Sequence, residues 1–287
     1  VILKNRGIED VEKFLEPSSG DIIPYSNLKN IKEAVELFSQ VVEKENPYVA
    51  IVIDADADGY TSSAVLYSYL QEHFSNLDIK YFFHENKEHG LTKFIMNNII
   101  EESNNRKFDL LILPDAGTSD YKAQCKLVEE YDIPIIVLDH HEPENGESQF
   151  AIVVNNQMSP KYKNKQLSGV GIVYKFLQAL DDKYLFMGAD EYLDLVAIGN
   201  IADSMDLSSP ETRYYVYEGL RNIKNKFIAE MVKEHIGEEK NLIYPQNFAF
   251  SINPKINAVI RVGKDEEKED LFRALCGVEE SSVNGRT

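Results

Sequence analysis

The sequence predicts an α/β protein with a doubly wound, mainly parallel sheet, followed by a mostly helical segment. Short apolar segments rich in β-branched residues recur between residues 48 and 154, and stretches with helical periodicity separate them. The first of these segments, 48–53, is apolar throughout rather than alternating, as expected for a strand that is buried on both faces of a sheet. After residue 165 the strand signal largely disappears and helical patterns take its place.

The expected elements follow one another in the order of βαβ units. Residues 1–30 combine short apolar pieces with turn residues, and the apolar spacing predicts an amphipathic helix over 30–45. Five strands are predicted over residues 48–54, 79–84, 110–113, 133–138 and 151–154. Helices are predicted over residues 61–74, 91–102, 121–131, 169–180, 192–205 and, as one or two helices, 210–236. The segment 248–263 is expected to be strand-like and then polar.

Composition places the chain among globular proteins and limits its partners. Apolar residues make up 43% and charged residues 27% of the 287 residues, and no apolar run approaches a membrane span. The two cysteines form no disulfide framework and the first residues lack a signal-peptide pattern, so a cytoplasmic location is expected. The net charge of −18 argues against a uniformly basic nucleic-acid-binding face, although a metal-dependent nucleic-acid enzyme remains compatible with it.

An acidic cluster follows the first predicted strand. Asp54, Asp56 and Asp58 precede Gly59, and three crowded carboxylates repel one another unless a cation lies among them. The pattern also matches the first half of an EF-hand loop, but that loop needs a glutamate at its twelfth position, where this chain has Val65. An EF-hand loop also follows a helix, whereas a predicted strand precedes this segment. We therefore expect a metal site of another kind.

Further acids and histidines end the later elements. Asp115 follows the third predicted strand, His140 and His141 follow the fourth, and Asp203 ends an apolar helix. Because the carboxyl ends of parallel strands share one edge of a sheet, these side chains are expected to meet in one crevice. Carboxylates with imidazole and without thiolate suit Mn²⁺, Mg²⁺ or Fe²⁺ better than structural zinc. This many acids suggests two ions about 3.5–4 Å apart.

These motifs together resemble a known family. The ordered motifs are D-x-D-x-D-G at 54–59, P-D-x-G at 114–117, D-H-H at 139–141 and G-x-I-A-D at 199–203. They are similar to the four motifs of the DHH phosphoesterase superfamily. The segments 168–171, followed by Lys175, and 256–263 resemble its RecJ branch, which comprises single-stranded-DNA-specific exonucleases working 5′ to 3′. The resemblance runs from about residue 48 to residue 263.

The resemblance assigns roles to individual residues. It implies two Mn²⁺ or Mg²⁺ ions, with Asp115 bridging them and Asp54 as an extra ligand or a supporting acid. The other implied metal ligands are Asp56, Asp58, His140 and Asp203. It makes Asp115, His140 and His141 the catalytic residues, and His141 would contact the scissile phosphate.

The resemblance also implies how DNA is held. Arg261 and Asn257 would bind DNA phosphates. His89 stands where the family usually has an aromatic residue in an Arg and Gly-Tyr-Gly loop, so it is expected to contact substrate there. The family's G-G-H domain and OB-fold are not found after residue 263. We therefore expect weak DNA affinity for this chain.

The expected function is a RecJ-like 5′–3′ exonuclease that hydrolyses single-stranded DNA to mononucleotides with two metal ions. A single-strand-binding protein or a helicase is an expected partner. One alternative is a DHH-type hydrolase of short oligonucleotides, cyclic dinucleotides or pyrophosphate. Another is a non-catalytic replication scaffold derived from this fold, which the retained acids and histidine pair disfavour.

Four regions are expected along the chain. Residues 1–46 form an N-terminal helical lead-in, and residues 47–165 form the α/β metal-binding DHH subdomain. Residues 166–263 form its mostly helical continuation, which carries Asp203 and Arg261. Residues 264–287 are expected to be a C-terminal tail, which suggests a truncated chain.

Overall fold

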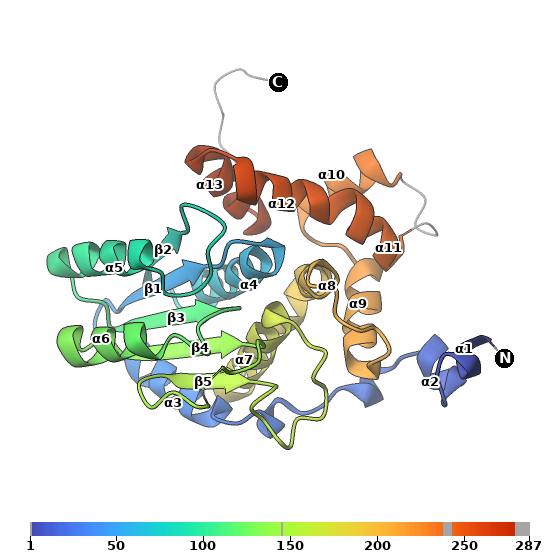
Figure 1. Ribbon diagram of the computed structural model, residues 1–287, viewed down its shortest axis with the longest axis horizontal. Coiled ribbons are helices and arrows are strands. Elements are labelled where there is room, and N and C mark those ends of the chain that lie inside the picture. The colour runs from blue at the N-terminus through green and yellow to red at the C-terminus, as the bar shows by residue number, and fades with distance from the viewer. Residues whose placement is uncertain (1, 145, 238–242, 279–287) are drawn as a thin grey trace.

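A five-stranded parallel sheet forms the centre of the molecule (Figure 1). The computed structural model describes residues 2–144, 146–237 and 243–278. The strand order is β2-β1-β3-β4-β5, and every pairing is parallel. The strands are β1 (Tyr48–Ile53), β2 (Asp78–Phe83), β3 (Leu110–Pro114), β4 (Ile135–Asp139) and β5 (Ile152–Asn155). The predicted α/β fold is therefore confirmed.

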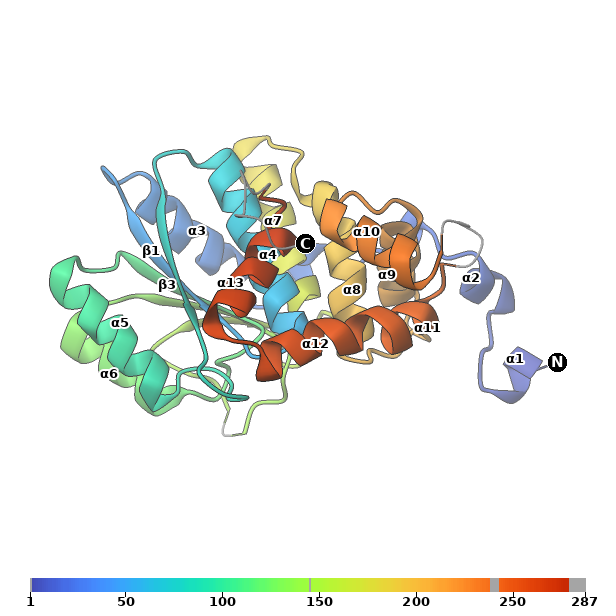
Figure 2. The same cartoon turned by 90° about the horizontal axis from the view of Figure 1, so that it is seen from above.

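Helices cover both faces of the sheet (Figure 2). One face packs against α5 (Lys93–Asn105) and α6 (Tyr121–Tyr131). The other packs against α3 (Ile31–Val42), α4 (Ala57–His73) and α7 (Gly169–Tyr184). Successive residues of β1 alternate between the two cores, and all of them are buried. This double coverage explains why the central strands are continuous apolar runs in the sequence.

The N-terminal segment consists of short elements, as expected. They are α1 (Ile2–Asn5), α2 (Val11–Leu15) and the 3₁₀ turns η1 (Ser19–Asp21) and η2 (Tyr25–Asn27). Figure 1 shows α1 and α2 beside the helical half, away from the sheet. No helix of the described ranges has the length and apolar character that crossing a membrane requires.

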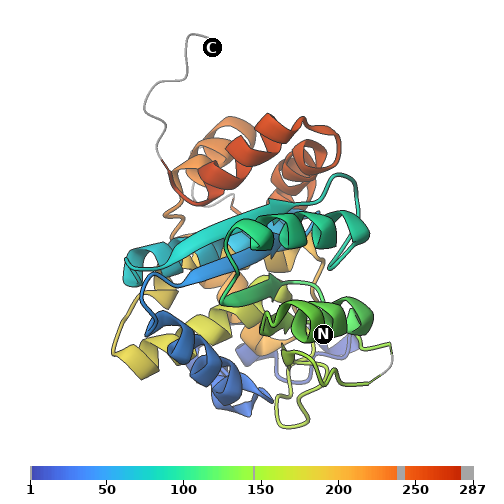
Figure 3. The same cartoon turned by 90° about the vertical axis from the view of Figure 1, so that its left-hand side faces the viewer.

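The second half of the chain is helical. After η3 (Ala189–Tyr192), the chain forms α8 (Leu193–Ala202), α9 (Pro210–Arg221) and α10 (Lys226–His235). It continues with α11 (Pro245–Asn247), the π-helical turn η5 (Phe248–Ile252), α12 (Asn253–Val262) and α13 (Asp265–Leu275). Figure 3 shows the last helices, in orange and red, as a layer beside α4 and the β2 side of the sheet.

The expectation of a strand-like segment over 248–263 is wrong. These residues are helical, and the buried side chains recur at every fourth position, at Phe248, Ile252, Ile256 and Ile260. That spacing places them on one face of a helix, which packs against α4 and α8. A short apolar run does not distinguish a strand from a buried helix, and the neighbouring aromatic and β-branched residues favoured the wrong choice.

The expectation of a tail over 264–287 is wrong for the part that the structure describes. Helix α13 lies there, and its Phe272 is buried against Tyr60 of α4 and beside Tyr81 and Phe83 of β2. Residues 279–287 of the expected tail lie outside the described residues. The division of the chain into four regions stays a prediction.

Candidate metal centre

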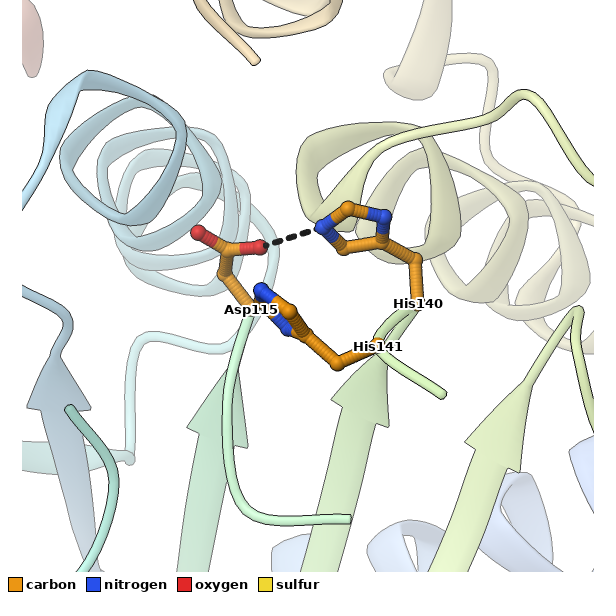
Figure 4. A group of neighbouring side chains, drawn as sticks. All are labelled: Asp115, His140 and His141. Atoms are coloured by element: carbon orange, nitrogen blue, oxygen red, sulfur yellow. Dashed lines mark ion pairs between the residues drawn. The ribbon is translucent and has the colours of Figure 1, made fainter. Parts of the chain in front are cut away.

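The predicted acids lie where the strand order reverses. β2 and β3 lie on opposite sides of β1, so the ends of β1 and β3 flank a switch point, which is where open α/β sheets bind ligands. Asp54 directly follows β1, Asp115 follows β3, and His140 follows β4. Ligand atoms of Asp115, His140 and His141 lie within 4.8 Å of one another (Figure 4). The expected convergence at one sheet edge is confirmed.

His140 connects two of the clusters in this centre. Its Nε2 lies 3.3 Å from Asp115 Oδ1 and 3.4 Å from Asp203 Oδ2. The same nitrogen lies 3.9 Å from Asp58 Oδ2. Burial lowers the pKa of His140, which favours the neutral imidazole that metal ions bind. A separate cluster of ligand atoms is formed by Asp54, Asp56 and His89.

The start of α4 places two of the acids. The helix begins at Ala57 rather than at the predicted Thr61, because Asp56 caps it by accepting a hydrogen bond of 3.0 Å from the Gly59 amide. Asp58 therefore lies in the first helical turn, where a negative charge is favoured.

Asp58 is also bound to the N-terminus of a second helix. Its carboxylate accepts hydrogen bonds from Ser168 Oγ at 3.0 Å and from the Gly169 and Val170 amides at 2.7 and 3.2 Å. This contact accounts for the 168–171 motif, whose backbone begins α7. Burial raises the pKa of Asp58, and these hydrogen bonds oppose that rise.

Two glycines of the motifs leave space for the carboxylates. A Cβ atom added at Gly169 would lie 2.2 Å from Asp115 Oδ1, and one added at Gly199 would lie 2.3 Å from Asp58 Oδ1. Both distances are far below van der Waals contact, so any larger residue would displace an acid. The glycines are therefore required by the close approach of α7 and α8 to the centre.

Asp115 is held in an uncommon backbone conformation. Its φ of 64° lies in the left-handed region, which costs a residue other than glycine about 1–3 kcal/mol. Its carboxylate is buried, and its Oδ1 has no hydrogen-bond partner. Burial, together with the charges of Asp58, Asp56 and Asp54, raises the pKa of Asp115 well above its ordinary value.

Asp54 and Asp203 belong to different clusters of ligand atoms, and both have raised pKa values. Burial raises the pKa of Asp54 to about 6, although a contact with His89 opposes that rise. Asp203 follows α8 directly, and burial with the charges of Asp58 and Asp56 raises its pKa to about 7. Each carboxylate thus makes its neighbours harder to ionise.

His141 differs from His140 in exposure and partner. Its side chain is 56% exposed, and its Nδ1 lies 2.8 Å from Asp139 Oδ1. The hydrogen bond with Asp139 raises the pKa of His141 to about 9. Burial alone would raise the pKa of Asp139, but hydrogen bonds from His141 and Thr118 lower it. Asp139 is therefore an ionised carboxylate that orients His141.

The donor set of the centre fits divalent cations. Among the described residues, no lysine or arginine forms an ion pair with Asp54, Asp58, Asp115 or Asp203. Two buried atoms, Asp115 Oδ1 and His140 Nε2, face each other without hydrogen-bond partners. Unpartnered buried atoms and unbalanced acids are costly unless a cation is bound. Carboxylate oxygens with imidazole suit Mn²⁺ and Mg²⁺.

The two predicted phosphate-binding residues lie together on α12. Arg261 is exposed, and no acid of the described chain forms an ion pair with it. Asn257 accepts a hydrogen bond of 3.1 Å from the Ala57 amide and so fastens α12 to the start of α4. Both residues line a groove that also includes Ala202 and Ser204, the neighbours of Asp203. Arg261 thus lies beside the centre rather than in it.

His84 is a residue of this centre that the sequence patterns did not indicate. This residue directly follows β2, its side chain is 1% exposed, and its Nε2 lies 3.7 Å from Asp54 Oδ1. Burial lowers the pKa of His84 to about 4, so the ring is neutral. The signal that could have found it is its place at the carboxyl end of a parallel strand. His89, which is expected to contact substrate, lies against Asp54, and the substrate contact stays a prediction.

The fold and centre define an α/β protein with a carboxylate and histidine site at the switch point of a parallel sheet. The family model described as the DHH family, N-terminal domain, matches residues 48–200. The chain belongs to the DHH family.

Relatives and solved structures extend this comparison. YorK of Bacillus subtilis, an SPbeta prophage-derived protein provisionally named a single-strand DNA-specific exonuclease, is 42% identical over 274 residues, which are 96% of this chain and 46% of YorK. The single-stranded-DNA-specific exonuclease RecJ of Bacillus subtilis is 30% identical over 95% of this chain and 35% of its own length. The chain thus spans about half the length of such relatives, or less.

Among solved structures, RecJ from Thermus thermophilus in complex with Mn²⁺ superposes with a TM-score of 0.78 at 26% identity. The match covers 96% of this chain and 38% of that one. A second structure, of exonuclease RecJ bound to manganese, has a TM-score of 0.73 at 27% identity and covers 89% of this chain and 66% of that one.

Proposed function

We propose that this chain is the catalytic core of a metal-dependent phosphodiesterase that removes mononucleotides from single-stranded DNA in the 5′ to 3′ direction. The observation that carries the proposal is the cluster of buried carboxylates at the switch point, which no lysine or arginine of the described chain balances. The names of YorK and RecJ as single-strand DNA-specific exonucleases support the substrate class.

The acids would hold two ions of Mn²⁺ or Mg²⁺. Asp58, His140 and Asp203 would hold one, Asp54 and Asp56 the other, and Asp115 would bridge them. When bound, two such ions lower the pKa of a water and neutralise charge that develops on a phosphoryl group. The fold holds the ligands in place for the ions. The N-termini of α4 and α7 fix the carboxylate of Asp58, and Gly169 and Gly199 leave the space that Asp115 and Asp58 occupy.

His141 would act on the scissile phosphate. The hydrogen bond with Asp139 raises the pKa of His141, which favours the charged ring, and Asp139 holds Nδ1. Its Nε2 has no hydrogen-bond partner in the described chain and can donate to a phosphate oxygen. In the reaction a water oxygen bonds to phosphorus, the bond from phosphorus to the 3′ oxygen breaks, and that oxygen takes up a proton.

Arg261 would hold the DNA backbone next to the centre. Its exposed guanidinium has no ion pair in the described chain, and a planar fork suits a phosphate. The groove beside it carries few other cations, and the chain has a net charge of −18, so DNA affinity is expected to be weak and salt-sensitive. Tight binding that persists in high salt would contradict this view of the groove.

Hydrolysis assays test the proposal directly. We would incubate 5′-labelled single-stranded DNA with Mn²⁺, and a labelled dinucleotide and pyrophosphate in parallel. Release of mononucleotides from the 5′ end, stopped by a chelator, is the expected result. Release from the 3′ end, or the absence of any release from DNA, would overturn the proposal.

A hydrolase of small substrates is the second candidate, and the acidic charge with the sparse cations of the groove favours it. Cleavage of only the dinucleotide or pyrophosphate would establish it.

The retained acids and histidines argue against a non-catalytic scaffold. A single-strand-binding protein or a helicase that loads the chain on DNA is part of the proposal, and a cytoplasmic location stays a prediction.

A further inference from the structure

The loop between β2 and α5 brings two histidines to Asp54. His89 Nδ1 contacts Asp54 Oδ2, and the ligand atoms of Asp54, Asp56 and His89 lie within 4.8 Å of one another. His84 Nε2 lies 3.7 Å from the other oxygen, Asp54 Oδ1; its side chain is 1% exposed, and neither of its ring nitrogens has a hydrogen-bond partner. The carboxylate of Asp54 thus lies between two imidazoles.

The backbone of this loop is fixed rather than free. The Gly90 amide donates to Asp54 Oδ1 at 3.1 Å, and the Leu91 amide donates to Asp120 Oδ2 at 2.7 Å. Gly90 has a φ of +67°, and a Cβ atom there would lie 2.2 Å from Asp120 Oδ2. The position of His89 at the centre is therefore set by its neighbours on both sides.

Helix α13 anchors the beginning of the same loop through hydrogen bonds to its backbone. The buried Lys268 donates from Nζ to the Glu85 carbonyl oxygen at 3.1 Å and approaches the His84 carbonyl oxygen at 3.5 Å. The loop is held by α13, by Asp54 and by Asp120. His89 therefore loses little backbone freedom when its ring binds a metal ion. This favours binding at a fixed place.

A hydrogen bond between His89 and Asp54 does not by itself explain why His84 is buried beside Asp54. Its buried nitrogens would remain without partners, which is costly. If His89 and Asp54 both turn toward a cation, the N–H of His84 becomes the outer hydrogen-bond partner of Asp54. Carboxylates that ligate metals commonly have such a partner, which orients them.

We propose that His89 is a ligand, with Asp54 and Asp56, of one of the two ions, and that His84 orients Asp54. This rests on the two-ion centre of the proposed function. It replaces the substrate contact expected for His89. A ligand set with imidazole suits Mn²⁺, whereas Mg²⁺ strongly prefers oxygen, so this position selects Mn²⁺ over Mg²⁺.

Anomalous diffraction from crystals soaked in Mn²⁺ alone tests the contact. We expect one of two Mn²⁺ peaks at bonding distance from His89 Nδ1, about 2.1 Å for a metal–imidazole bond. Two peaks that both lie more than about 3.5 Å from His89 would overturn the proposal.

Calorimetry of the wild type and of His89→Phe, which keeps a ring but removes both nitrogens, tests the selectivity. We expect Mn²⁺ affinity at one position to fall at least about 10-fold and Mg²⁺ affinity to fall less, so that the Mn²⁺ preference decreases. The control is His235→Phe, which lies on α10 outside the centre and should leave both affinities unchanged. An unchanged ratio of Mn²⁺ to Mg²⁺ affinity in His89→Phe would contradict the proposal.

DNA hydrolysis by the same wild-type preparation separates the two proposals. DNA hydrolysis without a bond between Mn²⁺ and His89 would overturn this inference and leave the proposed function in place. A bond between Mn²⁺ and His89 in a protein that hydrolyses no DNA would support the inference and overturn the function. Crystals that take up no Mn²⁺ at all would overturn both.

Discussion

Two buried groups of charged residues in this protein differ in how their charges are balanced. In the first, Lys175 of α7 forms an ion pair of 2.7 Å with Glu211 of α9. The ammonium also donates to the Ile23 carbonyl oxygen at 2.7 Å and to the Tyr215 hydroxyl at 2.6 Å. The carboxylate of Glu211 accepts further bonds from Tyr162, Asn164 and the Ile23 amide. Every charge in this group has an internal partner.

The metal centre has no such balance. Asp54, Asp58 and Asp115 are as deeply buried as Glu211, but the basic groups that face them in the described chain are histidines, and buried atoms of Asp115 and His140 lack partners. The comparison teaches that burial of charge alone does not mark a functional site. A balanced pair joins helices, whereas an unbalanced cluster requires something from outside.

Asp115→Asn tests the unbalanced cluster and should have the largest effect. We expect DNA hydrolysis in Mn²⁺ to fall at least about 100-fold, since a bridging ligand is lost. Burial and the neighbouring carboxylates raise the pKa of Asp115, and Asn removes the negative charge that this environment disfavours. The melting temperature in chelator should therefore be unchanged or higher. A wild-type hydrolysis rate would contradict the two-ion account.

Lys175→Met tests the balanced group. It leaves Glu211 buried without its cation, so the free energy of unfolding should fall by about 3–5 kcal/mol, measured by urea denaturation. Addition of Mn²⁺ should not restore it. The control is Lys107→Met. It breaks the ion pair between Lys107 and Asp132, whose side chains are both exposed, and should leave the free energy of unfolding unchanged. Rescue of Lys175→Met by Mn²⁺ would show that the two groups are not independent.

Mn²⁺ itself should stabilise the protein through the unbalanced cluster. A ligand that binds only the folded state at 100 times its Kd adds about 2.7 kcal/mol to the free energy of unfolding. Urea denaturation with Mn²⁺ and with chelator measures this difference. Lys175→Met should keep the gain and Asp115→Asn should lose most of it. An equal gain in both variants would place the bound ion elsewhere.

Arg261→Gln sharpens the contrast between a paired and an unpaired cation. Lys175 is fully neutralised inside the protein, whereas Arg261 is exposed without an ion pair in the described chain. We expect the KM for single-stranded DNA to rise about 10-fold, as for loss of a charge-assisted phosphate contact, with kcat little changed. Arg273→Gln on α13 removes an exposed arginine outside the groove and serves as the control. Equal effects of both substitutions would indicate a general effect of charge.

The pH dependence of the metal-free protein tests the repulsion among the acids of the centre. The folded-state pKa values of Asp54 and Asp203, about 6 and about 7, exceed the unfolded value of about 3.9. The folded state therefore binds more protons between these values, and its stability falls as pH rises from about 4 to 7. Melting temperatures in chelator measure this, and the double variant Asp54→Asn with Asp203→Asn should flatten the dependence. A rise in stability over this range would contradict the repulsion.

Much of the fold and centre could be predicted from residue patterns. Continuous apolar strands such as β1 and β3 indicate a sheet covered on both faces, and both are fully buried. Once the sheet is parallel, the residues that end its strands must share an edge, which is why Asp54, Asp115 and His140 could be brought together from positions far apart. The start of α4 was less accessible, because it depends on the hydrogen bond between Asp56 and the Gly59 amide.

Local residue patterns were enough to predict the strands, their direction and the acids at their ends, because these follow from periodicity and local chemistry. Packing, by contrast, determines that Phe248 begins a helical face, that α13 anchors the loop of His89, and that Lys175 has an acidic partner while the acids of the centre have no lysine or arginine partner in the described chain. Whether a buried charge is balanced depends on residues brought close by packing, such as Ile23 and Glu211, and no local pattern records those distances.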